Sequence, residues 1–365
     1  MGFNAAVMVE TGHPLQIATL DLATLEETDV VVRVRATSLC HTDLEAVHGD
    51  LRTPLPFVPG HEAAGVVEWV GKKVRKVAVG DHVVTSWNPH CNTCFYCQRQ
   101  QHVLCQPYRE HAAKSFHFDG RPRLLWEDQP VHQLMYSGSF AELCVVSEDC
   151  AVAVSRDIPF ARACLIGCGV MTGYGAAMHV AKVEPGSIVT VIGCGAVGLS
   201  AIQGARMAGA ERIIAIDRQA SRLDVARQLG ATDTLTADDA LNALHLELTH
   251  GRGADYLFEA AGNPAAFRAS LDLVRPGGQV VWLGKLPADA DMSFRWSALM
   301  GEKRIVRSSY GAARPEHDFP TLAQAYLDGA LKLDEYVTST ITLQEINDGL
   351  DRLASGQDIR AVIEL

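Results

Sequence analysis

The chain has 365 residues, and a typical domain has about 150, so two domains are expected rather than one. Hydrophobic residues make up 48% and charged residues 21% of the chain, which excludes a disordered protein and indicates a globular one with a large core. The formal net charge of −11 disfavours binding to nucleic acids or to anionic membranes, so neither is expected as a partner.

The N-terminal residues lack the pattern of a secretory signal or a transit peptide, which favours a cytoplasmic protein. The ten cysteines therefore indicate metal ligation or thiol chemistry rather than a disulfide framework. The uncharged stretch from Pro185 to Ala205 has the length of a membrane span, but its glycines point to a nucleotide-binding loop instead.

The first 160 residues predict short strands, for example at 30–34 and 64–70, so this part is expected to be β-rich. From about Met171 the pattern changes to alternating strands and helices, which predicts a parallel sheet. Its strand candidates are 188–192, 213–216, 256–258 and 280–283, with a helix running to Gly209 after the first of them.

The last 50 residues contain an amphipathic segment at 322–327, a strand candidate at 337–342 and an apolar ending at 359–363. This ending is more similar to the first part of the chain than to the middle. We therefore expect the parallel-sheet domain to be inserted into the β-rich one.

Gly193, Gly195 and Gly198 form a G-x-G-x-x-G motif directly after the strand candidate at 188–192 and at the start of a helix. This context is typical of a dinucleotide loop, whose glycines allow a tight turn and the close approach of a pyrophosphate. Asp217 follows 19 residues after the last glycine and favours NAD, because its carboxylate accepts hydrogen bonds from ribose hydroxyls. Arg218 and Arg222 leave some NADP tolerance open, and a glycine-rich turn without a ligand is the alternative.

Cys91, Cys94, Cys97 and Cys105 lie within 15 residues in the pattern Cys-x2-Cys-x2-Cys-x7-Cys. Four thiolates satisfy tetrahedral zinc and leave no free position, so a structural zinc is predicted. An iron–sulfur cluster and unmetallated thiols are the alternatives. A nucleic-acid zinc ribbon is disfavoured, because few basic residues lie close by.

Three further fragments each offer a metal ligand: Cys40 in Cys-His-Thr-Asp, His61 in Gly-His-Glu, and Cys168 between two glycines. Together with the glycine loop and the cysteine cluster, they resemble the zinc-dependent alcohol dehydrogenases of the medium-chain dehydrogenase/reductase family. The resemblance covers essentially the whole chain and includes the runs Gly60-His61-Glu62-Ala63-Ala64-Gly65 and 167–175.

The resemblance implies an α/β protein in which a Rossmann domain, a doubly wound parallel sheet, is inserted in a β-rich GroES-like catalytic domain. Its expected boundaries are 1–169 for the catalytic domain with its zinc lobe, 170–309 for the NAD-binding domain, and 310–365 for the return to the catalytic domain. The branch that it resembles best is that of the liver-type and aryl-alcohol dehydrogenases.

The resemblance also implies two zinc ions per chain, one structural and one catalytic, and NAD as the cofactor. Cys40, His61 and Cys168 match the ligands of the catalytic zinc, with one position left for water or substrate oxygen. Asp43 matches a carboxylate that orients the imidazole ligand, and Glu62 matches a residue that approaches the zinc and can become a transient ligand.

For proton transfer, Thr42 matches the hydroxyl that begins the family's relay. Many relatives complete this relay with a histidine five residues after the first zinc cysteine, where this chain has Glu45, so Glu45 or His48 is expected to take that role. The resemblance also implies cofactor contacts. Thr172 and Val197 match residues beside the nicotinamide, and His41 and Arg360 match residues near the pyrophosphate.

By resemblance Trp87 forms an aromatic wall of the substrate pocket, with Leu51, Leu134 and Met135 as further walls. Such an apolar cleft suits aromatic, allylic or medium-chain primary alcohols. The long segment 111–135 resembles the extended loop of the dimeric branches, so a homodimer is expected, with a tetramer as the alternative.

Three alternative functions stay open. One is a thiol-adduct formaldehyde dehydrogenase of the S-hydroxymethylglutathione type, for which Arg109 is suitably placed but an acidic pair near Leu51–Thr53 is lacking. Another is an enzyme with permanently bound NAD. The third is a zinc- and nucleotide-binding protein without catalytic activity.

Overall fold

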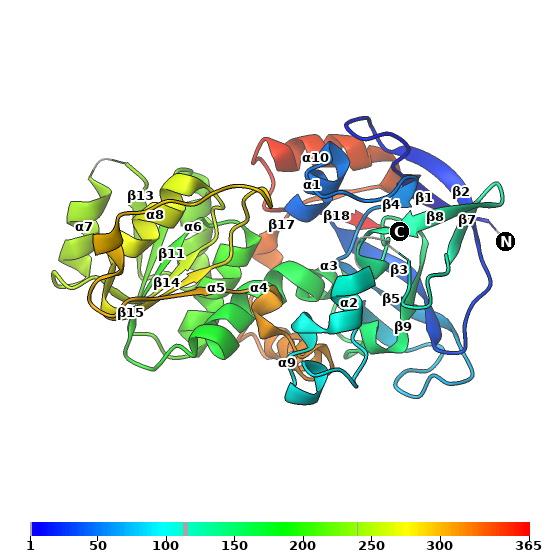
Figure 1. Cartoon of the computed structure of the whole chain (residues 1–365), viewed down its shortest axis with the longest axis horizontal. Coiled ribbons are helices and arrows are strands. Elements are labelled where there is room, and N and C mark those ends of the chain that lie inside the picture. The colour runs from blue at the N-terminus through cyan, green and yellow to red at the C-terminus, as the bar shows by residue number, and fades with distance from the viewer. Residues whose placement is uncertain (1, 112–115, 239) are drawn as a thin grey trace. The chain divides into compact units, whose positions relative to one another are not determined.

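The computed structural model describes residues 2–111, 116–238 and 240–365, which Figure 1 colours by residue number. These residues form two compact units. The first comprises Met1–Cys168 and Arg314–Leu365, and the second comprises Gly169–Ala313. The first unit is therefore assembled from two separate parts of the chain.

The first unit contains most of the short strands, as the sequence predicted for a β-rich part. Their bounds are β1 Phe3–Val7, β2 Gln16–Leu22, β3 Asp29–Ser38, β4 Phe57–Val58, β5 Ala63–Val70, β6 His82–Thr85, β7 Leu124–Trp126, β8 Gln129–Gln133, β9 Leu143–Ser147, β10 Ala151–Ala153, β17 Val337–Ile341 and β18 Arg360–Glu364. Within the described residues they form a seven-stranded sheet, β10-β6-β5-β3-β18-β17 with β9 on β3, and a five-stranded sheet, β1-β2-β7-β8-β4.

Strand β3 lies in the middle of the larger sheet. Its valines are buried on both faces of the sheet, as expected for a central strand. It pairs antiparallel with β5, β9 and β18, so the red C-terminal strand in Figure 1 returns to the blue β3. This pairing brings Cys40, which follows β3, close to Arg360, which begins β18.

The helices of the first unit are α1 His41–His48, α2 Gln106–His111, α3 Phe160–Leu165, α9 Pro315–Leu327 and α10 Ile346–Ala354. Helix α1 begins directly after Cys40, whose backbone N–H donates a hydrogen bond to Oδ2 of Asp43 at 3.0 Å and so satisfies a donor at the helix start. Gly49 ends the helix with a φ of 90°. The cap therefore holds Asp43 beside Cys40.

The second unit is a parallel sheet with helices between its strands. The strands are β11 Ile188–Ile192, β12 Arg212–Asp217, β13 Asp233–Thr236, β14 Ala254–Glu259, β15 Val274–Trp282 and β16 Arg304–Arg307. The helices are α4 Met171–Gly175, α5 Ala196–Met207, α6 Ala220–Leu229, α7 Leu241–Leu248 and α8 Pro264–Leu273. Among the described residues the strand order is β13-β12-β11-β14-β15-β16, and this doubly wound sheet confirms the predicted fold class.

One continuous helical stretch, Phe160–Ala181, is long and apolar enough to cross a membrane, the one such stretch that the described residues contain. It includes α3, α4 and the π-helical turns at Ile166–Val170 and Ala176–Ala181. Because 72% of its most apolar window is buried inside the protein, its composition matches that of a core helix.

The segment 111–135 is not simply the extended loop that the sequence predicted. It contains β7 and β8, which pair antiparallel through a turn at Glu127 and Asp128, both with positive φ. The strands are too short for their periodicity to stand out in the sequence. Residues 112–115 of this segment lie outside the described residues.

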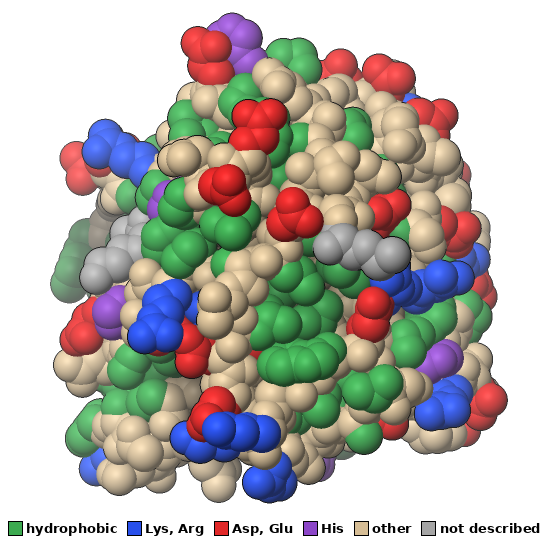
Figure 2. Space-filling model, turned by 90° about the vertical axis from the view of Figure 1, so that its right-hand side faces the viewer, with side chains coloured by type: hydrophobic (Ala, Val, Ile, Leu, Met, Phe, Trp, Pro, Cys, Tyr) green, Lys and Arg blue, Asp and Glu red, His purple; other side chains and the backbone are tan. Residues whose placement is uncertain are grey.

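Acidic and basic side chains are interspersed on the face of the protein that Figure 2 shows, around a group of hydrophobic ones near its middle. Large exposed hydrophobic residues of the first unit include Ile17 on β2 and Leu55 just before β4. Scattered hydrophobic residues of this kind are normal on protein surfaces.

Candidate metal and nucleotide sites

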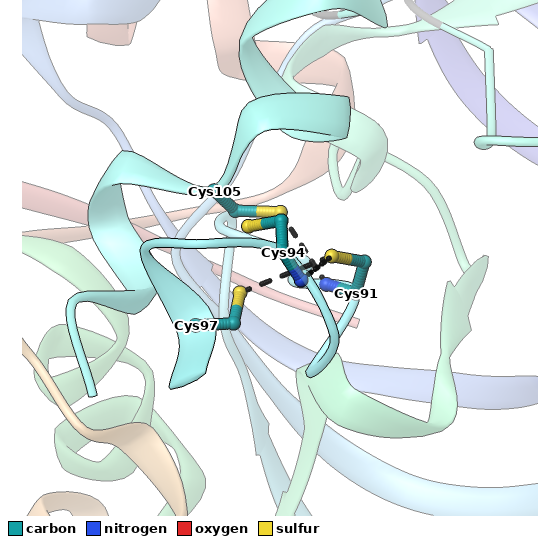
Figure 3. A group of neighbouring side chains, drawn as sticks. All are labelled: Cys91, Cys94, Cys97 and Cys105. Carbon is teal, nitrogen blue, oxygen red and sulfur yellow. Dashed lines mark hydrogen bonds between the residues drawn. The ribbon is translucent and has the colours of Figure 1, made fainter. Parts of the chain in front are cut away.

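The four cysteines of the predicted zinc lobe converge. Their four sulfur atoms lie within 4.8 Å of one another. Figure 3 shows the four side chains gathered in one place. The backbone N–H groups of Cys94 and Cys91 each donate to a cysteine sulfur at 3.3 Å, to Cys91 and Cys105 respectively. Backbone hydrogen bonds from Gln106 and Cys97 lower the pKa of Cys94 to about 6, which favours its thiolate. This donor set fits a closed tetrahedral zinc site.

A second group of metal-ligating atoms lies within 4.8 Å of one another in the first unit and belongs to Cys40, His61, Glu62 and Cys168. Cys40 stands between β3 and α1, His61 between β4 and β5, and Cys168 in the π-helical turn Ile166–Val170. A Cβ atom at Gly167 would lie 2.8 Å from the carbonyl oxygen of Thr85, so a glycine beside Cys168 allows this turn to approach β6 closely.

His61 fits a metal better than it fits any other partner in the described structure. Its Nδ1 lies 3.1 Å from Oδ1 of Asp43, while its Nε2 is buried and has no hydrogen-bond partner among the described residues. Asp43 also accepts hydrogen bonds from the backbone N–H groups of Cys40 and Gly60, both at 3.0 Å. The carboxylate therefore fixes the ring so that Nε2 is free to bind a metal.

The two thiols of this group lie close together and shift each other's pKa. A hydrogen bond from Cys168 lowers the pKa of Cys40 well below its usual value, and the same bond raises that of Cys168. Burial alone would lower the pKa of His61, but the negative charges of Asp43 and Cys40 raise it. Such an accumulation of thiolate and imidazole in a buried site is what a bound divalent cation stabilises.

Glu62 is held on both carboxylate oxygens. Oε1 accepts from Nη2 of Arg360 at 3.0 Å, and Oε2 accepts from Oγ of Ser38 at 2.7 Å. Burial raises the pKa of Glu62 to about 7. Arg360, expected to contact a pyrophosphate, is only 4% exposed and also lies 3.7 Å from the sulfur of Cys40. In this structure its guanidinium therefore contacts two residues of the metal-binding group, Glu62 and Cys40.

The residues expected to move protons lie on α1. Thr42 is buried, Glu45 is half-buried and His48 is exposed. His41, expected to contact the cofactor, is also exposed. All of these residues lie on α1, the helix that also carries Asp43. The relay itself stays a prediction.

The expected pocket walls fall into two sets. Leu134 belongs to the hydrophobic core of the first unit, and Leu51 and Met135 pack against this core, so their role as walls stays a prediction. Trp87 is 8% exposed and lies in an aromatic cluster, with its ring 6.3 Å from that of Tyr108.

Sequence reasoning missed Tyr108 and Tyr136, whose rings are 5.5 Å apart. Burial raises the pKa of Tyr108, and the charges of Tyr136, Cys150 and Cys168 add to this effect. The sequence did offer one signal for Tyr108, because it lies three residues after Cys105, on the helix that follows the zinc lobe.

The glycine loop of the second unit has the close approaches that its motif predicts. A Cβ atom at Gly198 would lie 1.8 Å from the carbonyl oxygen of Gly193, whereas at Gly195 the nearest atom, Nη1 of Arg222, would be 4.0 Å away. Gly198 thus allows α5 to pack on the preceding loop, and Gly195 leaves room at the helix N-terminus for a phosphate.

Asp217 ends β12 beside this loop. Its Oδ2 accepts from the N–H of Cys194 at 2.7 Å, and its Oδ1 accepts from the N–H of Gln219 at 2.9 Å, while Arg218 is exposed. Gly173, the residue after Thr172, packs closely on Val197, since a Cβ atom at Gly173 would lie 2.1 Å from the carbonyl oxygen of Val197. These residues fit a dinucleotide with free ribose hydroxyls.

Two family models match the chain. The "Alcohol dehydrogenase GroES-like domain" matches residues 26–156, and "Zinc-binding dehydrogenase" matches residues 196–328. A "Probable S-(hydroxymethyl)glutathione dehydrogenase 1" of Schizosaccharomyces pombe is 36% identical over 99% of this chain and 97% of its own length. An "Alcohol dehydrogenase class-3" of Myxine glutinosa is 37% identical, with the same coverage of both chains.

Solved structures are similar over the whole chain. The benzyl alcohol dehydrogenase of Acinetobacter calcoaceticus is 30% identical with a TM-score of 0.94, covering 100% of this chain and 99% of that one. An alcohol dehydrogenase zinc-binding domain protein of Burkholderia ambifaria is 33% identical with a TM-score of 0.95 and the same coverage.

Proposed function

The chain belongs to the zinc-dependent alcohol dehydrogenases of the medium-chain dehydrogenase/reductase family, and from this we propose that it interconverts a primary alcohol and its aldehyde. Members of this family are oxidoreductases that use NAD together with a catalytic and a structural zinc. The observation that carries the proposal is the unpartnered Nε2 of His61 beside the thiols of Cys40 and Cys168, among the described residues.

A zinc ion at this site supplies a Lewis acid for the substrate oxygen, and NAD supplies the hydride acceptor. Cys40, His61 and Cys168 are the three ligands that would hold the metal, which leaves a fourth position for substrate. Asp43 keeps the imidazole in place through Nδ1. Glu62 lies beside these ligands, and hydrogen bonds from Arg360 and Ser38 hold its carboxylate.

For the cofactor, Gly195 gives the pyrophosphate access to the N-terminus of α5, and Asp217 accepts hydrogen bonds from the ribose. Thr172 and Val197 are proposed to flank the nicotinamide. His41 is proposed to contact the pyrophosphate, whereas Arg360 is buried and paired with Glu62.

For the proton, the hydroxyl of Thr42 is proposed to receive it from the substrate alcohol. Glu45 or His48, three and six residues further along α1, is proposed to pass it to solvent. Glu45 is half-buried and His48 is exposed, so both side chains reach solvent.

Two substrate classes are proposed. The names of the similar curated proteins favour a thiol adduct of formaldehyde, and Arg109, exposed on α2, offers a charge for an anionic adduct. An aromatic alcohol is supported by Trp87 and Tyr108 and by the similar benzyl alcohol dehydrogenase. The relatives give the thiol adduct the stronger support, although an aromatic, allylic or medium-chain alcohol was the first expectation from the sequence.

The test is a panel of S-hydroxymethylglutathione, benzyl alcohol, cinnamyl alcohol and aliphatic alcohols, with reduction of NAD followed by absorbance. Arg109→Ala is expected to lower kcat/KM for the glutathione adduct and leave benzyl alcohol unchanged. The matched control is Arg99→Ala, an arginine of the same lobe whose side chain lies over the ring of Phe95. If no alcohol reduces added NAD although the protein carries two zinc ions, the result supports a protein without catalytic activity. If alcohol oxidation instead requires an external acceptor, the result supports an enzyme with permanently bound NAD.

The protein is further proposed to be cytoplasmic and to form a homodimer, with a tetramer as the alternative. Light scattering coupled to size-exclusion chromatography measures the oligomer directly.

A further inference from the structure

A third group of metal-ligating side chains lies outside both zinc sites. His90, Asp149 and Glu316 each place one ligand atom within 4.8 Å of the others. His90 precedes the zinc lobe, Asp149 lies in the short 3-10 helix Glu148–Cys150, and Glu316 lies in the first turn of α9. The group therefore joins three segments of the first unit that are far apart in the sequence.

A cation already sits on the two carboxylates. The ammonium of Lys76 donates to Oδ1 of Asp149 at 2.5 Å and also contacts Oε1 of Glu316. Nδ2 of Asn92 donates to the same Asp149 oxygen at 3.3 Å. Two carboxylates and one ammonium leave a net negative charge, which attracts a further cation to this group.

The imidazole of His90 is not used by this ion pair. His90 is only 5% exposed, and its Nδ1 is buried without a hydrogen-bond partner in the part of the chain that the structure describes. Its ring lies 4.2 Å from that of His102, whose Nδ1 is also buried and unpartnered there. A lysine needs only oxygen acceptors, whereas an imidazole next to two carboxylates is a donor set for zinc or a similar transition metal.

We propose that His90, Asp149 and Glu316 form a third divalent-cation site of the zinc class, which the Lys76 ammonium occupies when free metal is scarce. The Lys76 side chain is 36% exposed, so it can swing into solvent as the metal enters. Because the metal must displace a cation and finds no thiolate, this site is weaker than the two cysteine-containing sites. Its occupancy therefore follows the free zinc concentration, while the other two sites stay filled.

The test counts zinc per chain by atomic emission after equilibrium dialysis of the zinc-loaded protein against rising zinc concentrations. The wild type is expected to take up a third equivalent, and Glu316→Gln to lose it while keeping the other two. Lys76→Met is expected to bind the third equivalent at least about tenfold more tightly, because removal of a neighbouring positive charge favours a cation. Glu247→Gln, an exposed glutamate on α7 of the second unit, is the matched control and retains all three.

A second measurement identifies the ligands. Cobalt(II) added to the zinc-loaded protein is expected to give weak visible bands without thiolate charge transfer, and Glu316→Gln is expected to abolish them. Thermal unfolding of each variant with two zinc ions bound shows that it is folded. The proposal is overturned if wild type and Lys76→Met both stop at two zinc ions in millimolar zinc, or if the third equivalent survives Glu316→Gln.

Discussion

Arg360 and Glu62 form a buried ion pair, with Nη2 of the arginine 3.0 Å from Oε1 of the glutamate and both side chains next to Cys40. A buried charge is strongly destabilising when its partner is removed, by about 3–5 kcal/mol. Arg360→Met is therefore expected to lower the free energy of unfolding by about this amount, measured by urea titration of the zinc-loaded protein.

Glu62→Gln in the same background tests the origin of this loss. The double variant is expected to be more stable than Arg360→Met, because it no longer buries an unpaired carboxylate. A double variant as unstable as Arg360→Met contradicts the ion-pair explanation. Arg352→Met, which removes an arginine that pairs with Asp358, is the matched control.

Asp43→Asn tests the positioning of His61. Loss of the carboxylate is expected to weaken catalytic-site zinc about 10- to 100-fold, because a residue that orients a metal-bound imidazole has an effect of this size. The measurement is the rate of zinc release to a chelator, with the four-cysteine site as an internal reference. Asp50→Asn, an exposed neighbour, leaves the release rate unchanged.

Cys94→Ser tests the zinc lobe. Structural zinc contributes directly to folding, so this variant is expected to carry one zinc ion fewer per chain and to unfold at a lower temperature. Cys144→Ala, a buried cysteine outside both metal groups, is the control and keeps its zinc. Equal zinc content in Cys94→Ser and wild type rules out the predicted structural site.

Asp217→Ala tests cofactor choice. The carboxylate repels a 2′-phosphate, while Arg218 and Arg222 attract it, so the ratio of kcat/KM for NADP over NAD is expected to rise by at least about tenfold. The matched control is Asp224→Ala, an exposed aspartate on α6 that pairs with Arg227. A parent enzyme that already prefers NADP contradicts the role of Asp217.

His245 predicts a pH dependence of stability. Burial lowers its pKa to about 4 from an ordinary value of 6.5, so between these values the unfolded chain binds a proton that the folded chain does not. The free energy of unfolding therefore falls as the pH drops from 6.5 toward 4, by about 2–3 kcal/mol from this residue, and the dependence ends below 4. His245→Asn retains a partner for Thr190, whose hydroxyl lies 2.9 Å from Nε2, and is expected to show a flatter pH profile in urea titrations.

The sequence predicted the architecture because local patterns determine it. The strand at 188–192 was predicted with the bounds that β11 has, since four of its five residues are apolar, all five are β-branched, and glycines follow. The convergence of Cys91, Cys94, Cys97 and Cys105 could be predicted from their spacing alone. The fold and the four-cysteine donor set were therefore accessible without coordinates, whereas the grouping of Cys40, His61 and Cys168 was expected only from the resemblance to a known family.

Contacts between distant segments were not accessible in the same way. Nothing local in the sequence shows that Arg360 meets Glu62, or that Lys76 meets Glu316, because each pair depends on how β18 or α9 packs on the first half of the chain. Tyr108 was missed for the same reason, since its ring contacts with Trp87 and Tyr136 depend on how α2 packs.

The position of β18 beside β3 has a consequence for biosynthesis. The second unit has all of its strands once the ribosome has passed Ala313, so it can fold on the nascent chain. The larger sheet of the first unit must wait for the last residues, and with it the ion pair that holds Glu62 beside Cys40 and His61. The pocket around Cys40 and His61 is therefore completed only after β18 has been synthesised, even though Cys40 emerges near the start of translation.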